Sequence, residues 1–408
     1  MLEINFNKSL KKIANNFFKK IKKGSLFVTY PDNEKVMYRG DQNGYEAEIK
    51  LFNYKVFSKL LVKGSIGFAE SYMEKDFTCD NLSELLLFAY DNQSFFLKKG
   101  LISEVLNKYR RIKHHLNENT KSRSKKNISF HYDLGNEFYK LWLDPSMTYS
   151  SGIFTNSNKD LHKAQKNKYK EIANNLNLNE NSNVLEIGCG WGGFSSYIAK
   201  EYGSRVNAIT ISKEQFEFTS KKIFHEGLNE KVNVEMKDYR DIDKKYTNIA
   251  SIEMFEAVGK KYWKVFFNIL KESLSEEGSA ALQIITIKNE KAEFYQNNPD
   301  FIQQYIFPGG VLPSKKQLKD INLQLGLNIN EIQNFSNSYV KTLNIWNNKF
   351  QNSWPQIASQ GFKDKFKKMW EYYFSYCEVG FIEGTTDVSH FTITKLFIII
   401  ELLFQFFF

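Results

Sequence analysis

The chain has 408 residues, of which 42% are hydrophobic and 16% aromatic, and its formal net charge is +10 at pH 7. This length suggests two domains, and the apolar fraction is sufficient for globular cores. The positive charge favours an anionic partner, either nucleic acid or phospholipid head groups, and by itself it does not distinguish the two. Three scattered cysteines exclude a disulfide framework or a cysteine-based metal cluster. We therefore expect no metal site and a reducing, cytoplasmic setting.

The N-terminal stretch, residues 10–23, has apolar residues at helical spacing, and seven lysines lie between Lys8 and Lys23. A basic amphipathic helix of this kind can lie on an anionic membrane, and it can equally be an ordinary surface helix that packs on the protein. The stretch lacks the uninterrupted apolar core and the small-residue cleavage site of a secretory signal.

The next segment mixes short strands and helices. Strand-like runs at Leu26–Thr29 and Ala47–Leu51 are separated by turns, and a helical pattern follows around Leu82–Tyr90. Residues 97–129 are a basic connector, for which a solvated linker and a patch for an anionic surface are both consistent interpretations. We predict an N-terminal α+β domain with a basic linker over residues 1–125, with lipid or dimer contact as its expected role.

From Asn183 onward the sequence alternates regularly between strand-like runs and helical segments. This alternation predicts an α/β fold with a parallel, doubly wound, Rossmann-like sheet, in which ligands bind outside the carboxyl ends of the strands. We assign residues 126–395 to this domain. The predicted strands include Asn183–Ile187, Arg205–Ile211, Val232–Met236, Ile249–Ile252 and Ala280–Ile287.

The C-terminal run, residues 396–408, reads LFIIIELLFQFFF. It is too short to span a bilayer and is interrupted by Glu401 and Gln405. A packed edge, an interfacial tail and an end without function all remain open for it.

A glycine loop follows the first strand of the α/β domain, in the sequence VLEIGCGWGGF from Val184. Gly188, Gly190 and Gly192 let a ligand approach the backbone closely. Glu186 would repel a pyrophosphate but suits an ammonium group, such as the amino-acid end of S-adenosylmethionine, whose carboxylate the helix N-terminus would accept. A structural strand-to-helix turn is the alternative, and the carboxylate together with three glycines favours a cofactor loop.

Polar side chains after the next two strands are further candidates for the cofactor site. Thr210 and Gln215 are neutral hydrogen-bonding groups for a ribose or a methionine moiety, with Ser212 as an expected helix N-cap. Asp238 and Tyr239 follow the third strand, where an adenine edge would lie, and an exposed loop acid is the alternative for Asp238.

Five motifs then carry a resemblance to a known family. The chain resembles cyclopropane-fatty-acyl-phospholipid synthases and the related enzymes that modify mycolic acids, over about residues 20 to 390. In chain order the motifs are HYDLGNEFYKLWLDPSMTYSSGIF from His131, VLEIGCGWGGF from Val184, SIEMFEAVGKKYW from Ser251, FIQQYIFPGGVLPS from Phe301 and MWEYYFSYCEVGF from Met369.

The resemblance implies a seven-stranded class I methyltransferase domain behind a smaller N-terminal domain that helps dimerisation and lipid engagement. The implied reaction transfers the methyl group of S-adenosylmethionine to a cis double bond of a phospholipid acyl chain and closes a cyclopropane ring. We accordingly expect peripheral contact with unsaturated phospholipid at the inner face of the cell membrane, and a homodimer. We expect no nucleic-acid partner, because the sequence lacks a target-base motif and a nucleic-acid module.

The resemblance also assigns cofactor-binding residues across several motifs. It raises Tyr149 and Trp191, which by themselves are more typical of core aromatic residues, to cofactor contacts. The implied set is Tyr149, Ser150, Gly188, Gly190, Trp191, Thr210, Ile211, Gln215 and Ile252.

For the base that removes a proton during ring closure, the resemblance implies a bicarbonate held by five groups. Glu256, Tyr339 and the backbone of Ile285 match three of them. Ser151 stands where the family has a cysteine and Gln283 where it has a histidine, and both replacements still form hydrogen bonds. Two hypotheses follow: either these residues still orient a bicarbonate, or Glu256 accepts the proton itself, with a pKa raised in an apolar pocket.

Two further residues have weaker assignments. Cys377 matches a cysteine often marked as active in the family, although this mechanism does not require a thiol and packing is the alternative interpretation. His131 gains a lid or cofactor-clamp role from the resemblance. The altered base positions also leave open methyl transfer without ring closure, which would give a methyl-branched or methylene product.

Overall fold

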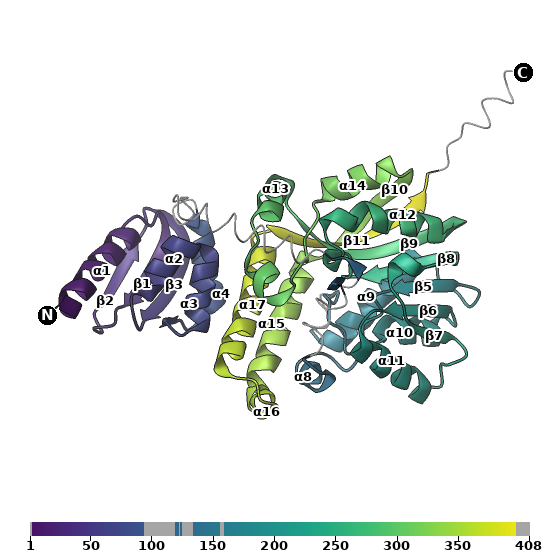
Figure 1. Cartoon of the computed structure of the whole chain (residues 1–408), viewed down its shortest axis with the longest axis horizontal. Coiled ribbons are helices and arrows are strands. Elements are labelled where there is room, and N and C mark those ends of the chain that lie inside the picture. The colour runs from purple at the N-terminus through teal and green to yellow at the C-terminus, as the bar shows by residue number, and fades with distance from the viewer. Residues whose placement is uncertain (1, 94–118, 122, 125–133, 156–158, 397–408) are drawn as a thin grey trace, which may run out of the picture. The chain divides into compact units, whose positions relative to one another are not determined.

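The computed structural model describes residues 2–93, 119–121, 123–124, 134–155 and 159–396 (Figure 1). The chain forms two compact units, neither of which is continuous in sequence. The first contains residues 1–116, 294–308 and 343–384, and the second contains residues 117–293, 309–342 and 385–408. The predicted division at residue 125 lies near the first of these boundaries, whereas the two later segments of the first unit were expected in the methyltransferase domain.

The first unit is built on a four-stranded mixed sheet in the order β2-β1-β3-β4. Strand β1 pairs antiparallel with β2 and parallel with β3, which confirms the predicted α+β character. Its N-terminal elements are α1 (Leu2–Phe18), β1 (Lys23–Thr29), β2 (Lys35–Arg39), β3 (Gln42–Leu51), α2 (Lys55–Lys63), α3 (Ser65–Met73), β4 (Phe77–Thr78) and α4 (Leu82–Asp91). Its later elements are η4 (Ile302–Ile306), α16 (Trp354–Ser359) and α17 (Asp364–Ile382).

Helix α1 covers most of the predicted N-terminal helix but ends at Phe18, five residues before the predicted end at Lys23, where β1 already begins. Phe18 is buried, with its ring centroid 5.3 Å from that of Tyr38. Lys11 forms ion pairs with the side chains of Asp32 and Glu34. The described part of the helix thus packs within its own unit, as the ordinary-helix interpretation expects.

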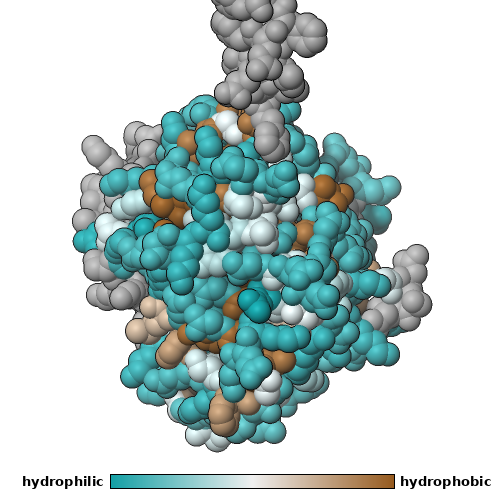
Figure 2. Space-filling view, turned by 90° about the vertical axis from the view of Figure 1, so that its right-hand side faces the viewer, coloured by the Kyte–Doolittle hydropathy of each residue, from teal (hydrophilic) through white to brown (hydrophobic). Residues whose placement is uncertain are grey.

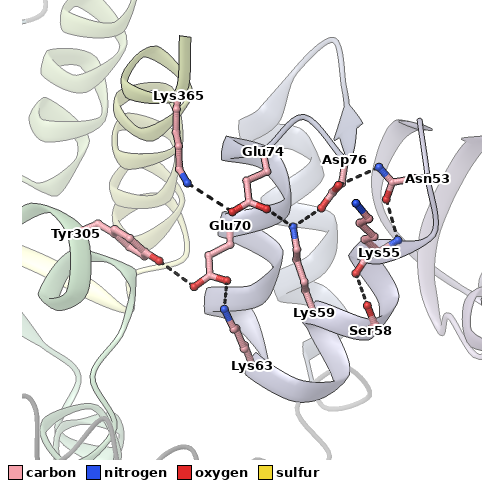
Figure 3. A network of polar contacts seen from close by, with 10 residues as sticks. All are labelled: Asn53, Lys55, Ser58, Lys59, Lys63, Glu70, Glu74, Asp76, Tyr305 and Lys365. Atoms are coloured by element: carbon pink, nitrogen blue, oxygen red, sulfur yellow. Dashed lines mark hydrogen bonds and ion pairs between the residues drawn. The ribbon is translucent and has the colours of Figure 1, made fainter. Parts of the chain in front are cut away.

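A network of lysines and carboxylates joins the N-terminal part of the first unit to its later helical segments (Figure 3). Lys59 lies between two carboxylates, 2.6 Å from Glu74 and 2.5 Å from Asp76. The Tyr305 hydroxyl donates a hydrogen bond to Glu70 at 2.8 Å, and the Lys365 ammonium lies 3.5 Å from Glu74. These contacts explain in part why segments far apart in sequence form one compact unit.

The second unit contains the predicted seven-stranded sheet, in the order β10-β11-β9-β8-β5-β6-β7 (Figure 1). The strands from β9 to β7 run parallel, while β11 is antiparallel to both of its neighbours. The strands are β5 (Asn183–Ile187), β6 (Arg205–Thr210), β7 (Val232–Met236), β8 (Tyr246–Ile252), β9 (Leu274–Ile287), β10 (Leu327–Asn334) and β11 (Thr386–Lys395). This architecture confirms the predicted Rossmann-like fold.

Helices lie on both faces of this sheet (Figure 1), and its central strands are largely buried. Every residue of β5 after Asn183 is buried. The unit's helices are α8 (Asn136–Lys140), α9 (Leu161–Asn175), α10 (Gly193–Glu201), α11 (Lys213–His225), α12 (Trp263–Ser273) and α14 (Lys315–Gln324), with short turns η1 (Tyr239–Asp241), η2 (Phe255–Ala257) and η3 (Lys260–Tyr262). Helices α13 (Asn289–Asn297) and α15 (Ser336–Asn352) each begin in this unit. The rigid core leaves the loops at the carboxyl ends of β5, β6 and β8 to form a site.

The surface of the second unit is mostly hydrophilic on the face that Figure 2 shows, with hydrophobic residues in small separate groups. Scattered apolar residues of this kind are ordinary on folded proteins. Among the described residues, no helix combines the length and the apolar character that a transmembrane segment needs.

Candidate active site

A pocket opens at the carboxyl ends of β5, β6 and β8, and all of its lining residues belong to the second unit. It brings together twelve of the thirteen residues predicted to bind the cofactor. These are Tyr149, Ser150, Glu186, Gly188, Gly190, Trp191, Thr210, Ile211, Gln215, Asp238, Tyr239 and Ile252.

The glycine loop has the close-packed geometry that its sequence predicts, and all three glycines have positive φ angles. A side-chain carbon on Gly188 would lie 2.7 Å from Cγ of Met254, whereas one on Gly190 would have no atom within 4 Å. Gly190 therefore leaves open space beside the pocket. Gly192 is outside the lining: it caps α10, where a side chain would lie 2.5 Å from Cγ2 of Thr219.

Glu186 is buried at the end of β5 and lines the pocket. The Ser195 hydroxyl donates a hydrogen bond to its carboxylate. Burial raises the pKa of Glu186 to about 8, because the charged form loses its hydration. A cationic ligand group in the pocket would favour the ionised carboxylate, so the side chain fits an ammonium.

The polar groups after β6 and β7 line the same pocket. The Thr210 hydroxyl donates to Oε1 of Gln215 at 2.9 Å, and Ser212 is the N-cap of α11, as expected. Asp238 is buried and forms an ion pair with Arg240 at 2.7 Å, so it is not an exposed loop acid. Although burial raises the pKa of Asp238, the hydrogen bonds from Arg240 outweigh that effect and lower it.

Aromatic and basic side chains support the other wall of the pocket. Trp191 donates from Nε1 to Asn136 at 2.7 Å, and its ring centroid lies 4.9 Å from that of Tyr139. The buried Lys168 donates to the Ser150 hydroxyl at 2.6 Å. Burial lowers the pKa of Lys168 to about 7. The backbone at Tyr149 and Ser150 is thus fixed between packed rings and a buried amine.

Glu253, which the sequence interpretation did not single out, is the carboxylate to which three of the five predicted catalytic residues donate hydrogen bonds. Its Oε1 accepts hydrogen bonds from the Ser151 backbone N–H at 2.9 Å and from Gln283 Nε2 at 2.6 Å. Its Oε2 accepts from the Tyr339 hydroxyl at 2.6 Å. Glu253 lines the pocket, and burial raises the pKa of its carboxyl group.

The orientation of the Gln283 amide is fixed from its other side by His390. The imidazole Nε2 lies 3.0 Å from Oε1 of Gln283, and burial lowers the pKa of His390 to about 3. The ring is therefore neutral, and its Nε2–H donates to the amide oxygen. As a result, the NH₂ group of Gln283 faces Glu253.

Glu256, which was expected either to help hold a bicarbonate or to accept the proton itself, is not among the residues that line the pocket. The backbone N–H of Ile285 donates to its Oε1 at 2.5 Å, so the expected proximity of Glu256 and Ile285 is present. Burial, followed by the neighbouring charge of Glu253, raises the pKa of Glu256 to about 8.

The backbone explains why two acids three residues apart have different surroundings. Glu253 follows the last residue of β8 and has a φ angle of 50°, in the left-handed region that a non-glycine residue rarely adopts. Such strained positions cluster at functional sites. The sequence signal was present, since Glu253 is the first acid after a buried strand, but the motif match directed attention to Glu256.

Besides Gly192 and Glu256, Ser151, Gln283 and Tyr339 do not themselves line the pocket and contact it through Glu253. Two further predicted residues take no part in these contacts. Cys377 lies on α17 in the first unit, partly buried, and does not line the pocket. His131 lies outside the described residues.

The expected bicarbonate and the expected sulfonium cofactor differ in how well they fit the residues present. The open glycine loop and the buried Glu186 fit the amino-acid end of S-adenosylmethionine. In contrast, two groups expected to hold bicarbonate, the Gln283 amide and the Tyr339 hydroxyl, already donate to Glu253, as does the Ser151 backbone N–H, while the Ser151 hydroxyl donates to the Gly152 carbonyl. They do not fit a bound bicarbonate while that side chain is in place.

This sheet, with a glycine loop and an acid at the end of its first central strand, defines a class I methyltransferase that depends on S-adenosylmethionine. Residues 119–391 match the family described as mycolic acid cyclopropane synthetase, and residues 13–100 match a domain of unknown function, DUF7884. The chain therefore belongs to the mycolic acid cyclopropane synthetase family.

Individual relatives agree with this assignment. The chain is 34% identical to the cyclopropane-fatty-acyl-phospholipid synthase of Escherichia coli, covering 82% of this chain and 84% of the relative. It is 31% identical to the tuberculostearic acid methyltransferase UfaA1 of Mycobacterium tuberculosis, covering 81% and 79% respectively. The structure of mycolic acid cyclopropane synthase CmaA1, complexed with SAH and CTAB, is similar at a TM-score of 0.63 and 28% identity, over 66% of this chain and 98% of that one.

Proposed function

We propose that this protein transfers the methyl group of S-adenosylmethionine to the cis double bond of a phospholipid acyl chain and forms a cyclopropane ring. The observation that carries the proposal is one pocket that combines a cofactor loop with a carboxylate held by Ser151, Gln283 and Tyr339. Family membership supports the same reaction class.

In the proposed cofactor complex, Glu186 binds the ammonium group and the loop at Gly188 and Gly190 accommodates the amino-acid end. Thr210, Gln215 and Asp238 hydrogen-bond the ribose and adenine parts, while Tyr149, Trp191 and Tyr239 enclose them. Bound S-adenosylmethionine supplies an electrophilic methyl group on a sulfonium, which an alkene can attack although it is a poor nucleophile.

The chain's own residues then have two tasks in catalysis. The packed aromatic walls exclude water, which would otherwise convert the cationic acyl chain into an alcohol. Aromatic faces also stabilise positive charge near them. A base must accept the proton whose loss closes the ring. Without that proton acceptor, methyl transfer would not lead to a stable cyclopropane.

Methyl transfer without ring closure is the second candidate function. Two observations favour it: Ser151 and Gln283 stand at positions where the family has cysteine and histidine, and one relative is named as a methyltransferase instead of a cyclopropane synthase. In that case loss of a proton from a chain carbon next to the cation gives a methyl-branched alkene. A hydride shift from the methylated carbon to the cation, followed by loss of a proton from the methyl group, gives a methylene chain.

We also propose that the protein reaches its substrate by peripheral contact at the inner face of the cell membrane, and that it acts as a homodimer. The net charge of +10 supports attraction to anionic head groups. Co-sedimentation with anionic but not zwitterionic vesicles, weakened by salt, is expected for the membrane contact. Analytical ultracentrifugation tests the dimer.

The reaction is tested with purified protein, labelled S-adenosylmethionine and vesicles of unsaturated phospholipid. Mass spectrometry and NMR of the released acyl chains identify the product. A cyclopropane ring supports the main proposal, whereas a branched or methylene chain supports the second candidate. No label in the lipid would contradict both.

A further inference from the structure

The hydrogen bonds around Glu253 carry an inference that rests on the proposed function and adds a catalytic residue to it. We propose that the Glu253 carboxylate is the proton acceptor of the reaction and takes the place of bicarbonate. The enzyme would then carry its base in its own chain and work without dissolved bicarbonate.

The first argument is the set of donors. A carboxylate and a bicarbonate are both planar oxyanions that accept hydrogen bonds in similar directions. Glu253 accepts from the Ser151 N–H, from Gln283 Nε2 and from the Tyr339 hydroxyl, all within 2.9 Å. These three residues come from different parts of the chain and converge on one side chain. They hold the carboxylate in a fixed position, as a base must be held.

The second argument is location. Glu253 lines the pocket together with the glycine loop and Ile252, at the carboxyl end of β8. Glu256 does not line it, and its Oε1 accepts a hydrogen bond from the Ile285 N–H. Among the described carboxylates, Glu186, Asp238 and Glu253 line the pocket, and Asp238 is ion-paired with Arg240. With Glu186 proposed to bind the cofactor's ammonium, Glu253 is left for proton transfer.

The third argument is the backbone. A φ angle of 50° lies in the left-handed region, which is strained for a glutamate unless the surroundings compensate for it. The backbone N–H of Glu253 donates to Gln283 O at 2.9 Å, so the turn and the donor set are joined. The strained turn is what directs this side chain toward Ser151, Gln283 and Tyr339.

Proton transfer to Glu253 and ring closure occur in one step that conserves atoms and charge. After the double bond has accepted the methyl group, the acyl chain is a cation. Glu253 takes a proton from that methyl carbon, and the electron pair of the broken C–H bond forms the last bond of the ring. The chain becomes neutral, Glu253 becomes a carboxylic acid, and the proton is released to solvent before the next turnover.

The test compares three variants with the wild type in buffer stripped of carbon dioxide and in the same buffer with added bicarbonate. E253Q keeps the size of the side chain but removes its basicity. E253G removes the side chain at a φ angle that glycine adopts readily, leaving the donors of Ser151, Gln283 and Tyr339 open to a bicarbonate. E276Q, at an exposed glutamate paired with Lys395, is the matched control.

We expect wild-type and E276Q rates to be equal and unaffected by bicarbonate. E253Q should lose about 10²- to 10⁴-fold in kcat with or without bicarbonate, the usual contribution of a general base. E253G should be similarly inactive in stripped buffer and regain activity when bicarbonate is added. ¹³C NMR with labelled bicarbonate should detect binding to E253G and none to the wild type.

Opposite results would overturn the proposal. One such result is a wild type that loses activity in stripped buffer and regains it with bicarbonate. The others are an E253Q variant with near wild-type kcat and bicarbonate bound to the wild type. Calorimetric affinity for S-adenosylhomocysteine, expected to be the same in all variants, shows that each one is folded. If the wild type labels no lipid under any condition, the proposed function fails. If the wild type labels lipid only when bicarbonate is present, this inference alone fails.

Discussion

The polar network of the first unit and the pocket of the second contain the same kinds of side chain in opposite electrostatic settings. In the first unit, lysines lie against carboxylates, and the hydrogen bond from Lys59 lowers the pKa of Glu74 (Figure 3). In the pocket region, Glu186 and Glu253 accept from hydroxyl, amide and backbone groups, and burial raises the pKa of both. Paired charges hold segments together, whereas buried carboxylates with neutral partners are poised to bind a cation or accept a proton.

The largest effect is expected when a carboxylate of the pocket is removed. E186Q should weaken S-adenosylhomocysteine binding by about 10- to 100-fold, because a hydrogen bond to a charged group contributes on the order of 1.5–3 kcal/mol. Isothermal titration calorimetry measures the affinity. E74Q, in the network of the first unit, is the matched control and should leave it unchanged. Equal losses in both variants would show that the pocket carboxylate has no special role.

A smaller effect is expected when one donor to Glu253 is removed. Y339F deletes the hydroxyl that favours the charged carboxylate, so the pKa of Glu253 should rise. A base must be deprotonated, and the acidic limb of the kcat profile should therefore move to higher pH, with a rate about tenfold lower on that limb.

The other titratable groups around Glu253 are Lys168, whose charge lowers the pKa of Glu253, the neighbouring Glu256, and His390, which is neutral and bonded to Gln283. Y305F, which removes a donor to Glu70 in the first unit, is the control for loss of a tyrosine hydroxyl. An unshifted profile in Y339F would mean that its hydroxyl does not act on the base.

Proton release on cofactor binding tests whether the buried Glu186 carboxyl group changes its protonation when a ligand binds. The pKa of Glu186 is about 8 without a ligand, so the side chain is mostly protonated at about pH 6.5. An ammonium group bound beside it favours the ionised form, and binding should release up to about one proton. Calorimetry of S-adenosylhomocysteine binding in buffers of different ionisation enthalpy counts that proton. E186Q should release none, and the same release from E186Q would place its source elsewhere.

The smallest effect is expected in the network of the first unit. K365A removes an exposed ammonium 3.5 Å from Glu74 and should lower the free energy of unfolding by less than about 1 kcal/mol. Urea denaturation measures it, and increasing salt should reduce the difference from the wild type. A loss of several kcal/mol would show that this pair is a central structural contact.

The sequence predicted the sheet because its signals are local. Strand β5 is short and mostly apolar, and Gly188 and Gly190 have the positive φ angles that their place after a strand indicates. The grouping of α17 with the N-terminal sheet was not predicted, because it depends on contacts between residues hundreds of positions apart, such as Lys365 with Glu74.

Most residues that line the pocket were predicted from the sequence, but the proposed proton acceptor, Glu253, was not. A motif match transfers roles position by position, so it placed Glu256 among the groups that hold a bicarbonate, with Glu256 itself as the alternative base, and gave Glu253 no role. The acid that contacts Gln283 and Tyr339 has a positive φ angle, and no periodicity in the sequence encodes that angle. An acid directly after a buried strand, beside altered partner positions at Ser151 and Gln283, is the pattern that would have indicated it.

The positive φ angle at Glu253 also has an evolutionary consequence. Glycine adopts that backbone conformation without strain, and a single nucleotide change separates glutamate and glycine codons. A lineage could therefore replace a bicarbonate base taken from solution with a glutamate base in the chain, or make the reverse change, without altering the fold. Since the Ser151 N–H and the Tyr339 hydroxyl that donate to Glu253 could donate to a bicarbonate in its place, such a change would spare the rest of the site. A single substitution in the turn after β8 could thus decide whether the enzyme requires dissolved bicarbonate.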